Sequence, residues 1–405
     1  MTIIGLDQVH NELAPKLKGT RVGLITSNMS RSSNLLSTLE IMKSIKSIKK
    51  LTLLSPEHGY FSEHQAGEII DPYFDEDLQV TIKSLYRKPK KMKKMADDNI
   101  DLLMRTMDSK RDNSKYPPKD LMENFDTIVY DLQDVGCRIY TYIATMIYSM
   151  EISGKIDQDF IILDRPNPIT GRSPEGPLLQ KQLFSFIGAV QVPIRHSLTL
   201  GEIALYFNRF YNKEKTLLSL IKMKNWKRDM WYDRTELPWI MPSPNIPTLD
   251  TAAVYPGMVM FEGTNVSEGR GTTKPFQVIG APWINGVKLK KVMEEFNYSS
   301  VQFLEVKFKP MFSKYSGEVC SGLYIFVKDR NSFRPFELSL AILRELLDLY
   351  PDEFTLFESY FDRVAGNKDV RKMLLHGYSP EEIVEKYRDE IDKYTSITEE
   401  ILIYK

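Results

Sequence analysis

Five short apolar runs, each followed at once by polar residues, constrain the fold of this chain more than any single motif does. They are RVGLIT, KKLTLL, FDTIVYD, DFIILD and the stretch through VQVPI. Runs of this length that are rich in branched side chains are typical of strands buried on both faces. Most of them are separated by enough residues for a crossover helix, which favours parallel pairing. Residues 1–236 are therefore predicted to form a Rossmann-like α/β domain with a mostly parallel sheet.

Residues 237–405 follow a different pattern. After a proline-punctuated stretch, VQFLEVKFKP and GLYIFVKD alternate as antiparallel strands do. The segments from Phe336 to Tyr350 and from Ser379 onward are amphipathic, and Ser379 with Glu382 forms a capping box at the start of the second. A chain of 405 residues is too long for one compact core. We therefore expect a smaller C-terminal α+β domain, with an active-site cleft between the two domains.

The charge balance narrows the choice of partners. Lys+Arg 54 equals Asp+Glu 54, so bulk electrostatics give no reason to expect nucleic acid. Residues 87–118 contain a lysine-rich run followed by acidic residues, which we interpret as a solvated surface insertion. No apolar stretch reaches the length of a membrane span. No long apolar leader is visible either, so we expect a cytoplasmic protein, or an exported one whose leader has been removed. The oligomeric state stays open.

Polar side chains follow the predicted strands at their carboxyl ends, the edge where open α/β sheets bind ligands. They are Asn28 after the first run, Glu57 and His58 after the second, Asp131 and Asp134 after the third, Asp164, Arg165 and Asn167 after the fourth, and His196 after the fifth. Ordinary turns need no such set of carboxylates, imidazoles and an arginine. The pattern therefore predicts a catalytic rim and an enzyme.

Each of these candidates also has a structural interpretation. Glu57 could serve catalysis if its surroundings shift its pKa, or could simply accept hydrogen bonds from loop amides. One of Asp131 and Asp134 could cap the helix predicted in CRIYTYIATMIY, which leaves the other, by its position Asp134, to face the cleft. Asp164 and Arg165 either line the site or form a network that holds their own loop. His196, which follows the fifth run, either binds a ligand or is a hydrogen-bonded structural group.

Residues 262–273, EGTNVSEGRGTT, form the densest polar stretch. Its glycines allow close backbone approach to a ligand, and Arg270 suits a carboxylate or phosphate, although a structural loop is the alternative. GxGxxG, a P-loop, a G-x-S-x-G elbow and metal-ligand spacings are absent, so we expect no cofactor and no metal. The remaining carboxylates, aromatics and amides, Asn245 among them, suit a sugar with an anionic group. Glycoside hydrolysis would need two carboxyl groups about 5–5.5 Å apart for retention, or about 6.5–9.5 Å apart for inversion.

Ordered motifs also carry a resemblance to a known family. SPEHGYF, DLQDVGCRIYTYI, LDRPNPITG, IRHSLTLGE, PSPNIPT and EGTNVSEGRGTTKPFQVIGAPW together resemble the exo-β-N-acetylmuramidase family, from about Gly23 to the C-terminus. The resemblance implies release of N-acetylmuramic acid from the non-reducing ends of peptidoglycan fragments, an oligosaccharide substrate. It makes Glu57 the candidate general acid/base. A non-catalytic glycan- or nucleotide-sugar-binding protein on the same scaffold is the alternative.

The resemblance implies further site residues. Asp134 is our candidate for the second catalytic carboxylate, although the identity of that group stays open. The residues carried over as site-lining are Arg138, Tyr140, Asp164, Arg165, Asn167, His196, Glu262, Asn265, Glu268 and Arg270; Asn28, His58 and Asn245 complete the predicted substrate-binding set. Two departures concern local structure: Ser197 and Arg87 each stand where the family pattern has glycine.

Overall fold

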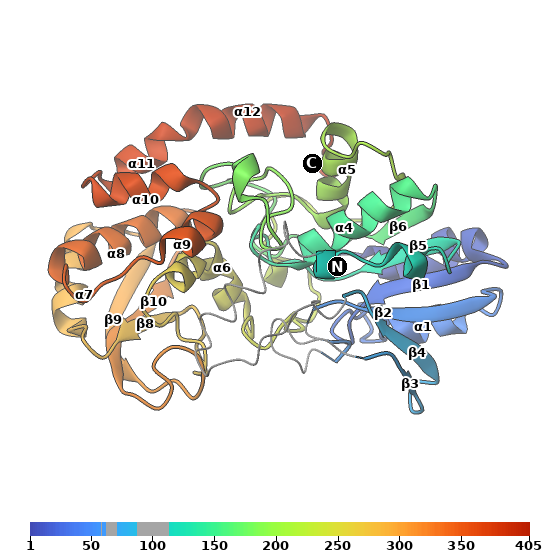
Figure 1. The fold of residues 1–405 in the computed structure, drawn as a ribbon, viewed down its shortest axis with the longest axis horizontal. Coiled ribbons are helices and arrows are strands. Elements are labelled where there is room, and N and C mark those ends of the chain that lie inside the picture. Colours follow the sequence, from blue (N-terminus) through green and yellow to red (C-terminus); the bar gives the residue numbers. More distant parts are fainter. Residues whose placement is uncertain (58, 62–70, 87–112) are drawn as a thin grey trace.

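A seven-stranded sheet forms the N-terminal part of the computed structural model, which describes residues 1–57, 59–61, 71–86 and 113–405 (Figure 1). The strand order is β3-β4-β2-β1-β5-β6-β7, and all neighbours are parallel except β3 and β4. The strands are β1 Arg21–Thr26, β2 Lys50–Ser55, β3 Tyr73–Asp75, β4 Val80–Ser84, β5 Thr127–Asp131, β6 Asp159–Leu163 and β7 Leu217–Ile221. The first four predicted runs are thus confirmed as parallel strands.

The fifth predicted strand is wrong. Residues 190–194 form a largely buried connection with bends and without a ladder, and only the next residue, Arg195, makes isolated bridges, to Cys137 and Glu175. Pro193 has no amide hydrogen to donate, which disfavours a place inside a sheet. The sheet is completed instead by β7, a half-exposed edge strand of sequence LLSLI that is not among the five predicted runs.

Both faces of the large sheet are covered, which explains the continuous apolar runs. Consecutive residues, such as Ile128 and Val129 of β5, belong to separate hydrophobic clusters on opposite faces. One face carries α4 (Tyr142–Lys155) and α5 (Leu200–Phe210), which contact each other and β6. The other carries α1 (Thr38–Ser44) and the short helices of residues 5–17. A one-turn helix, α3 (Lys119–Met122), packs against α4.

The C-terminal part is built on a smaller antiparallel sheet of order β8-β10-β9. The predicted pair is confirmed as β9 (Val301–Phe308) and β10 (Cys320–Val327). The other elements are α6 Leu249–Met258, the 3-10 helix η7 Val259–Gly263, β8 Val278–Ala281, α7 Gly286–Glu295, α8 Pro335–Leu349, α9 Glu358–Ala365, α10 Lys368–Leu375, α11 Pro380–Lys386 and α12 Arg388–Glu399. The capping box predicted at Ser379 is present, and Thr199 forms another with Glu202 in the N-terminal part.

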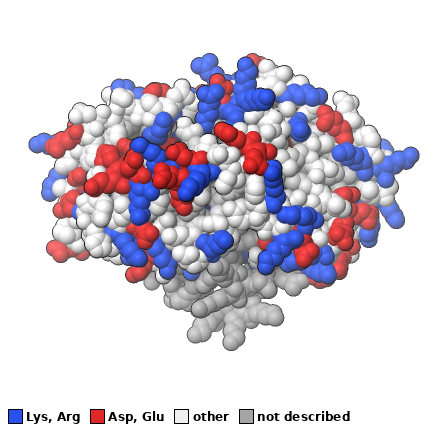
Figure 2. Space-filling model, turned by 90° about the horizontal axis from the view of Figure 1, so that it is seen from above, with Lys and Arg blue, Asp and Glu red and all other residues white. Residues whose placement is uncertain are grey.

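The two parts share one hydrophobic cluster, which runs from α4 and α5 into α6 and α8. The domain boundary at residues 236/237 therefore stays a prediction. Helix α12 runs from the C-terminal part toward the N-terminal part, so that the C-terminus lies beside α5 (Figure 1). On the face shown in Figure 2, basic and acidic side chains are mixed, as the balanced composition predicts. In the described ranges, no helix is long and apolar enough to span a membrane.

Candidate active site

Glu57 lies just beyond the carboxyl end of β2, and its side chain is only 6% exposed. Its Oε2 accepts a hydrogen bond of 2.6 Å from the Thr141 hydroxyl. Thr141 is the residue that precedes α4, so the start of this helix orients the carboxylate. The Lys115 Nζ lies 3.6 Å from Oε1. Sequence reasoning singled out Glu57 but did not identify Thr141 or Lys115.

Asp134 follows β5 and is paired with His196. Its Oδ2 accepts a hydrogen bond from the Gly136 amide at 2.7 Å and lies 3.0 Å from His196 Nε2. His196 Nδ1 accepts a hydrogen bond from the Leu198 amide, so this nitrogen carries no proton and Nε2–H donates to Asp134. Both ring nitrogens are thus occupied. Asp134 Oδ1 is buried and has no hydrogen-bond partner among the described residues.

Two buried tyrosines lie next to Asp134. Burial raises the pKa of Tyr140 well above its usual value, and the Asp134 charge adds to this effect while nearby Ser243 opposes it. Burial, together with the charges of Glu262 and Asp134, likewise raises the pKa of Tyr255. Both phenols therefore stay neutral and can donate hydrogen bonds. Asn245, two residues after Ser243, is also buried.

The C-terminal part contributes a ladder of alternating charges. Glu262, in η7, accepts hydrogen bonds from Arg270 Nη2 at 2.6 Å and from the Tyr360 hydroxyl at 3.0 Å. Arg270 Nε lies 3.3 Å from Glu268 Oε1, whose other oxygen accepts from Lys314 at 3.0 Å. Although burial opposes it, the charges of Lys314 and Arg270 hold the pKa of Glu268 below its usual value. Arg270 thus already holds two carboxylates, while 23% of its side chain stays exposed.

The charges of Asp134 and Glu262 both affect two buried groups, the Cys137 thiol and the Tyr255 hydroxyl. Burial raises the pKa of the Cys137 thiol to about 12, and Asp134 and Glu262 both contribute to that rise. The Tyr255 hydroxyl likewise lies within the field of both carboxylates. Asp134 comes from the N-terminal part and Glu262 from the C-terminal part, so residues of both parts surround one region. An open cleft there stays a prediction.

The DRPNP loop serves the fold through all three of its predicted residues. Asp164 accepts hydrogen bonds from the Thr199 and Tyr404 hydroxyls and from two backbone amides, and burial raises its pKa to about 6. Arg165 forms a two-pronged ion pair with Asp131, at 2.5 and 2.8 Å. Asn167 bonds the backbone of its own and the next loop. The loop-holding network that the sequence left open is present, although Arg165 pairs with Asp131 and not with Asp164.

The remaining predicted residues are dispersed. Asn28 accepts a hydrogen bond from Arg31, and the Asn265 amide bonds the backbone of residues 353 and 355. Arg138 donates to the carbonyl of Val364, away from Glu57. His58 lies outside the described residues. Neither Asp131 nor Asp134 caps α4, because the residue before this helix is Thr141. Substrate binding by these residues stays a prediction.

The usual nucleotide position of a doubly wound sheet is filled in this chain. The chain passes from β1 to β2 on one side of the sheet and from β5 to β6 on the other. In folds of this type, ligands bind at the carboxyl ends of the two strands from which the chain leaves in opposite directions. Here the cavity beside these ends measures about 10 Å³, with Gln133, Arg165, Tyr232 and Pro238 in its wall. A space of this size holds about one water molecule. It does not accommodate a nucleotide-sugar. Within the described residues, no three His, Cys, Asp or Glu side chains converge as a metal site.

Comparisons with known proteins agree along the whole chain. The model for the N-terminal domain of exo-β-N-acetylmuramidase NamZ matches residues 22–109 and 109–250, and the model for its C-terminal domain matches residues 253–404. The peptidoglycan β-N-acetylmuramidase NamZ of Bacillus subtilis is 37% identical over 401 residues, which are 99% of this chain and 91% of that protein. Two DUF1343 family proteins of Bacteroides fragilis, with crystal structures, superpose over 100% of this chain and 99% of theirs, with TM-scores of 0.87 and 0.74 at 29% and 27% identity. The chain belongs to the exo-β-N-acetylmuramidase NamZ family.

Proposed function

We propose that this protein is an exo-acting glycosidase that releases N-acetylmuramic acid from the non-reducing ends of peptidoglycan fragments. The observation that carries the proposal is the match along nearly the whole chain to the peptidoglycan β-N-acetylmuramidase of Bacillus subtilis. In the reaction, the bond between the anomeric carbon and the glycosidic oxygen breaks. The oxygen of water forms the new bond to that carbon, and the leaving oxygen takes a proton. Most glycoside hydrolase families carry out this chemistry with two carboxyl groups and no cofactor.

Glu57 and Asp134 are our candidates for the two carboxyl groups. Glu57 is held by the Thr141 hydroxyl, so its orientation is fixed before substrate arrives. Among the described residues, Asp134 is held through Oδ2 alone, and we assign its other oxygen, Oδ1, to the reaction. We assign the neutral hydroxyls of Tyr140 and Tyr255 to binding the sugar, since phenols at this position can donate to its oxygens.

The assignments on the C-terminal side are proposals as well. We assign Glu262, Glu268 and Arg270 to the sugar substituents, with Arg270 facing the lactyl carboxylate through the part of its guanidinium that stays exposed. A cytoplasmic location, in which the enzyme acts on imported fragments, also remains a prediction. Fractionation of cells that produce the full-length protein tests it.

Hydrolysis of 4-nitrophenyl β-N-acetylmuramide tests the activity and Glu57 together, with the N-acetylglucosaminide as the control sugar. We expect turnover of the muramide only, and a loss of about 10²–10⁴-fold in Glu57→Gln, as is usual for a positioned acid or base. The exposed Glu123→Gln is the matched control and should retain full activity. A wild-type enzyme inactive on the muramide would contradict the proposed function, whereas an active Glu57→Gln would contradict only the role of Glu57.

A further inference from the structure

Lys115 is a buried lysine that lies against Glu57. It ends the short helix η4 (Asn113–Lys115), at the C-terminal end of the segment interpreted from the sequence as a solvated insertion. Its Nζ lies 3.6 Å from Glu57 Oε1, and the two side chains are 7% and 6% exposed. The lysine-rich run preceding it gave no sign of this role, because a single lysine after such a run resembles the others.

Aromatic rings enclose the Lys115 ammonium. Its Nζ lies 4.9 Å from the centre of the Tyr86 ring and 4.8 Å from that of Phe186. The two rings meet edge to face, with centres 5.6 Å apart. Ring faces attract a cation, but they only partly compensate for removing it from water. The carboxylate of Glu57 supplies an opposite charge in the same dry environment, which explains why a lysine is tolerated there.

The described residues that face Glu57 also include two that carry hydroxyls. Thr141 donates its hydrogen bond from the start of α4. The Tyr86 hydroxyl, from the segment after β4, is paired with Thr145 at 2.7 Å. Burial, and then the Glu57 charge, raises the pKa of Tyr86 well above its usual value, with a smaller contribution from Tyr142 of α4. These groups are neutral at ordinary pH, whereas Lys115 brings a positive charge.

We propose that Lys115 is a positioning residue that keeps Glu57 in its charged form, so that Glu57 enters the reaction as a carboxylate and not as a proton donor. The proposal rests on the proposed glycosidase function and narrows the role of Glu57 within it. The physical reason is that an opposite charge within about 4–6 Å favours the ionised state of a carboxyl group. Glu57 then acts as base or nucleophile, and the proton for the leaving oxygen comes from another group.

The pH dependence of kcat/KM tests this role. In Lys115→Met the cation is gone, so Glu57 takes up a proton at higher pH. We expect the acid limb to move up by about one to three pH units, while the alkaline limb stays in place. Lys115→Arg keeps the charge and the ring contacts, and its acid limb should stay near that of the wild type. Lys119→Met removes an exposed lysine that pairs with Glu123, and should change neither limb.

Two results would overturn the proposal. Movement of the alkaline limb in Lys115→Met would mean that Glu57 works in its protonated form. Unchanged limbs, with Glu57→Gln inactive, would show that Lys115 serves the fold alone while the glycosidase function stands. Lys115→Gln, which is neutral but can still donate to Glu57, replaces the methionine variant if that protein does not fold.

A double-mutant cycle tests the ion pair without any activity. Melting temperatures of Lys115→Met, Glu57→Gln and the combined variant should be non-additive, because either single substitution takes an oppositely charged partner away from the remaining buried charge. Additive changes would contradict the proposal even if the substrate were a different glycan.

Discussion

At the scale of single residues, the hydrogen bonds of Asp134 and His196 show which of their polar atoms are already occupied. The imidazole donates to Asp134 through Nε2 and accepts from the Leu198 amide through Nδ1, so it cannot also bind a ligand through a nitrogen. Its contribution is therefore the orientation of Asp134. The sequence analysis proposed both residues for the site, but it did not predict the hydrogen bond between them.

Two substitutions of His196 separate its hydrogen bonds. In His196→Gln, the amide nitrogen can reach the position of Nε2 and still donate to Asp134. In His196→Asn, the shorter side chain can retain the bond from Leu198 but not the bond to Asp134. We expect His196→Asn to have a lower kcat than His196→Gln, by up to about 100-fold, since a misplaced catalytic group costs about that much. Equal kcat values in folded variants would contradict this assignment.

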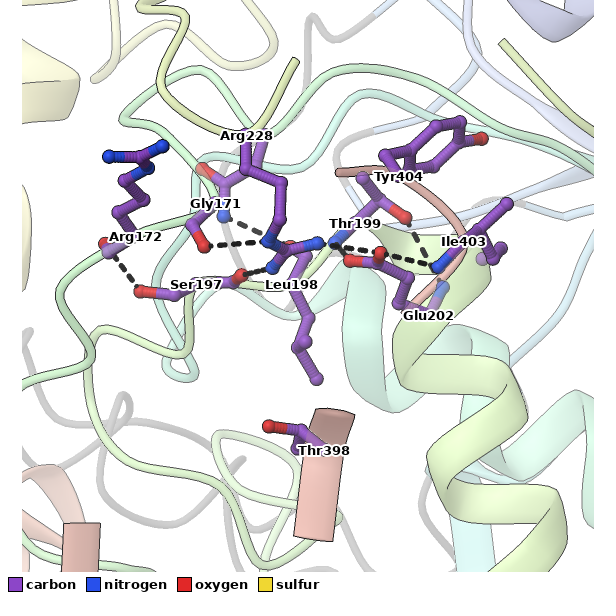
Figure 3. A network of polar contacts seen from close by, with 12 residues as sticks. Gly171, Arg172, Ser197, Leu198, Thr199, Glu202, Arg228, Thr398, Ile403 and Tyr404 are labelled. Carbon is purple, nitrogen blue, oxygen red and sulfur yellow. Dashed lines mark hydrogen bonds and ion pairs between the residues drawn. The ribbon is translucent and has the colours of Figure 1, made fainter. Parts of the chain in front are cut away.

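At the scale of elements, the C-terminal tail is bonded to the loop after β6 and to the first turn of α5. The Tyr404 hydroxyl donates to Asp164 at 2.6 Å, and the Ile403 amide donates to Glu202 at 3.0 Å. Figure 3 shows Arg228 between Glu202 and the carbonyl of Ser197, to which it donates. The tail therefore fixes the turn that follows His196.

That turn explains one departure from the family pattern. Ser197 has φ +58°, a left-handed conformation that favours glycine and costs other residues about 1–2 kcal/mol. The Ser197 hydroxyl donates to the Arg172 carbonyl at 2.7 Å, and the Arg228 side chain donates to the Ser197 carbonyl. These bonds offset the strain, so a serine can occupy a position where the family pattern has glycine.

Tyr404→Phe should destabilise the protein more at pH 8 than at pH 5. Burial raises the folded-state pKa of Asp164 to about 6, so its ionisation weakens the fold as the pH rises from about 4 to about 6. The Tyr404 hydroxyl opposes this by stabilising the charged form. Its loss should cost about 1–3 kcal/mol at pH 8 and less at pH 5. Urea unfolding at the two pH values, with the exposed Tyr378→Phe as control, checks this; an equal loss at both would contradict it.

At the scale of the whole molecule, Arg138 joins the two parts of the chain. It lies between β5 and α4, and its Nη2 donates to the carbonyl of Val364 in α9 at 2.8 Å. Burial lowers its pKa to about 10, and within the described residues its Nε and Nη1 have no hydrogen-bond partner. Helix α9 also carries Tyr360, which binds Glu262. The contact thus helps to set the position of Glu262 relative to Asp134.

Two glycines that follow helices test the contact between Arg138 and the end of α9. Gly366 and Gly377 have φ of +76° and +80°, but a Cβ at Gly366 would lie 2.5 Å from Arg138 Nη2, while one at Gly377 would meet nothing within 4 Å. Gly377→Ala should cost about 1 kcal/mol of strain, and Gly366→Ala about 1–3 kcal/mol more. Urea unfolding measures both. The difference should shrink in an Arg138→Met background, and a difference that persists there would show that Arg138 is not its cause.

The sequence by itself determined the parallel strands, the capped helices and the place of Glu57 and Asp134 at strand ends. These features depend on local patterns of apolar residues, and a strand buried on both faces imposes such a pattern on its own segment. The edge strand β7 was missed although four of its five residues are apolar, because a short apolar run alone does not distinguish a strand from part of a helix.

Only the tertiary structure decided which polar groups meet. Thr141 reaches Glu57 across 84 positions and Tyr404 reaches Asp164 across 240, while Lys115 approaches Glu57 from an unrelated segment. A buried charge needs a partner, but nothing in the local sequence specifies where in the chain the partner lies. The candidates for the site were therefore readable from the sequence, whereas the division between residues that serve chemistry and residues that hold the loops follows from how the two sheets and the returning tail pack.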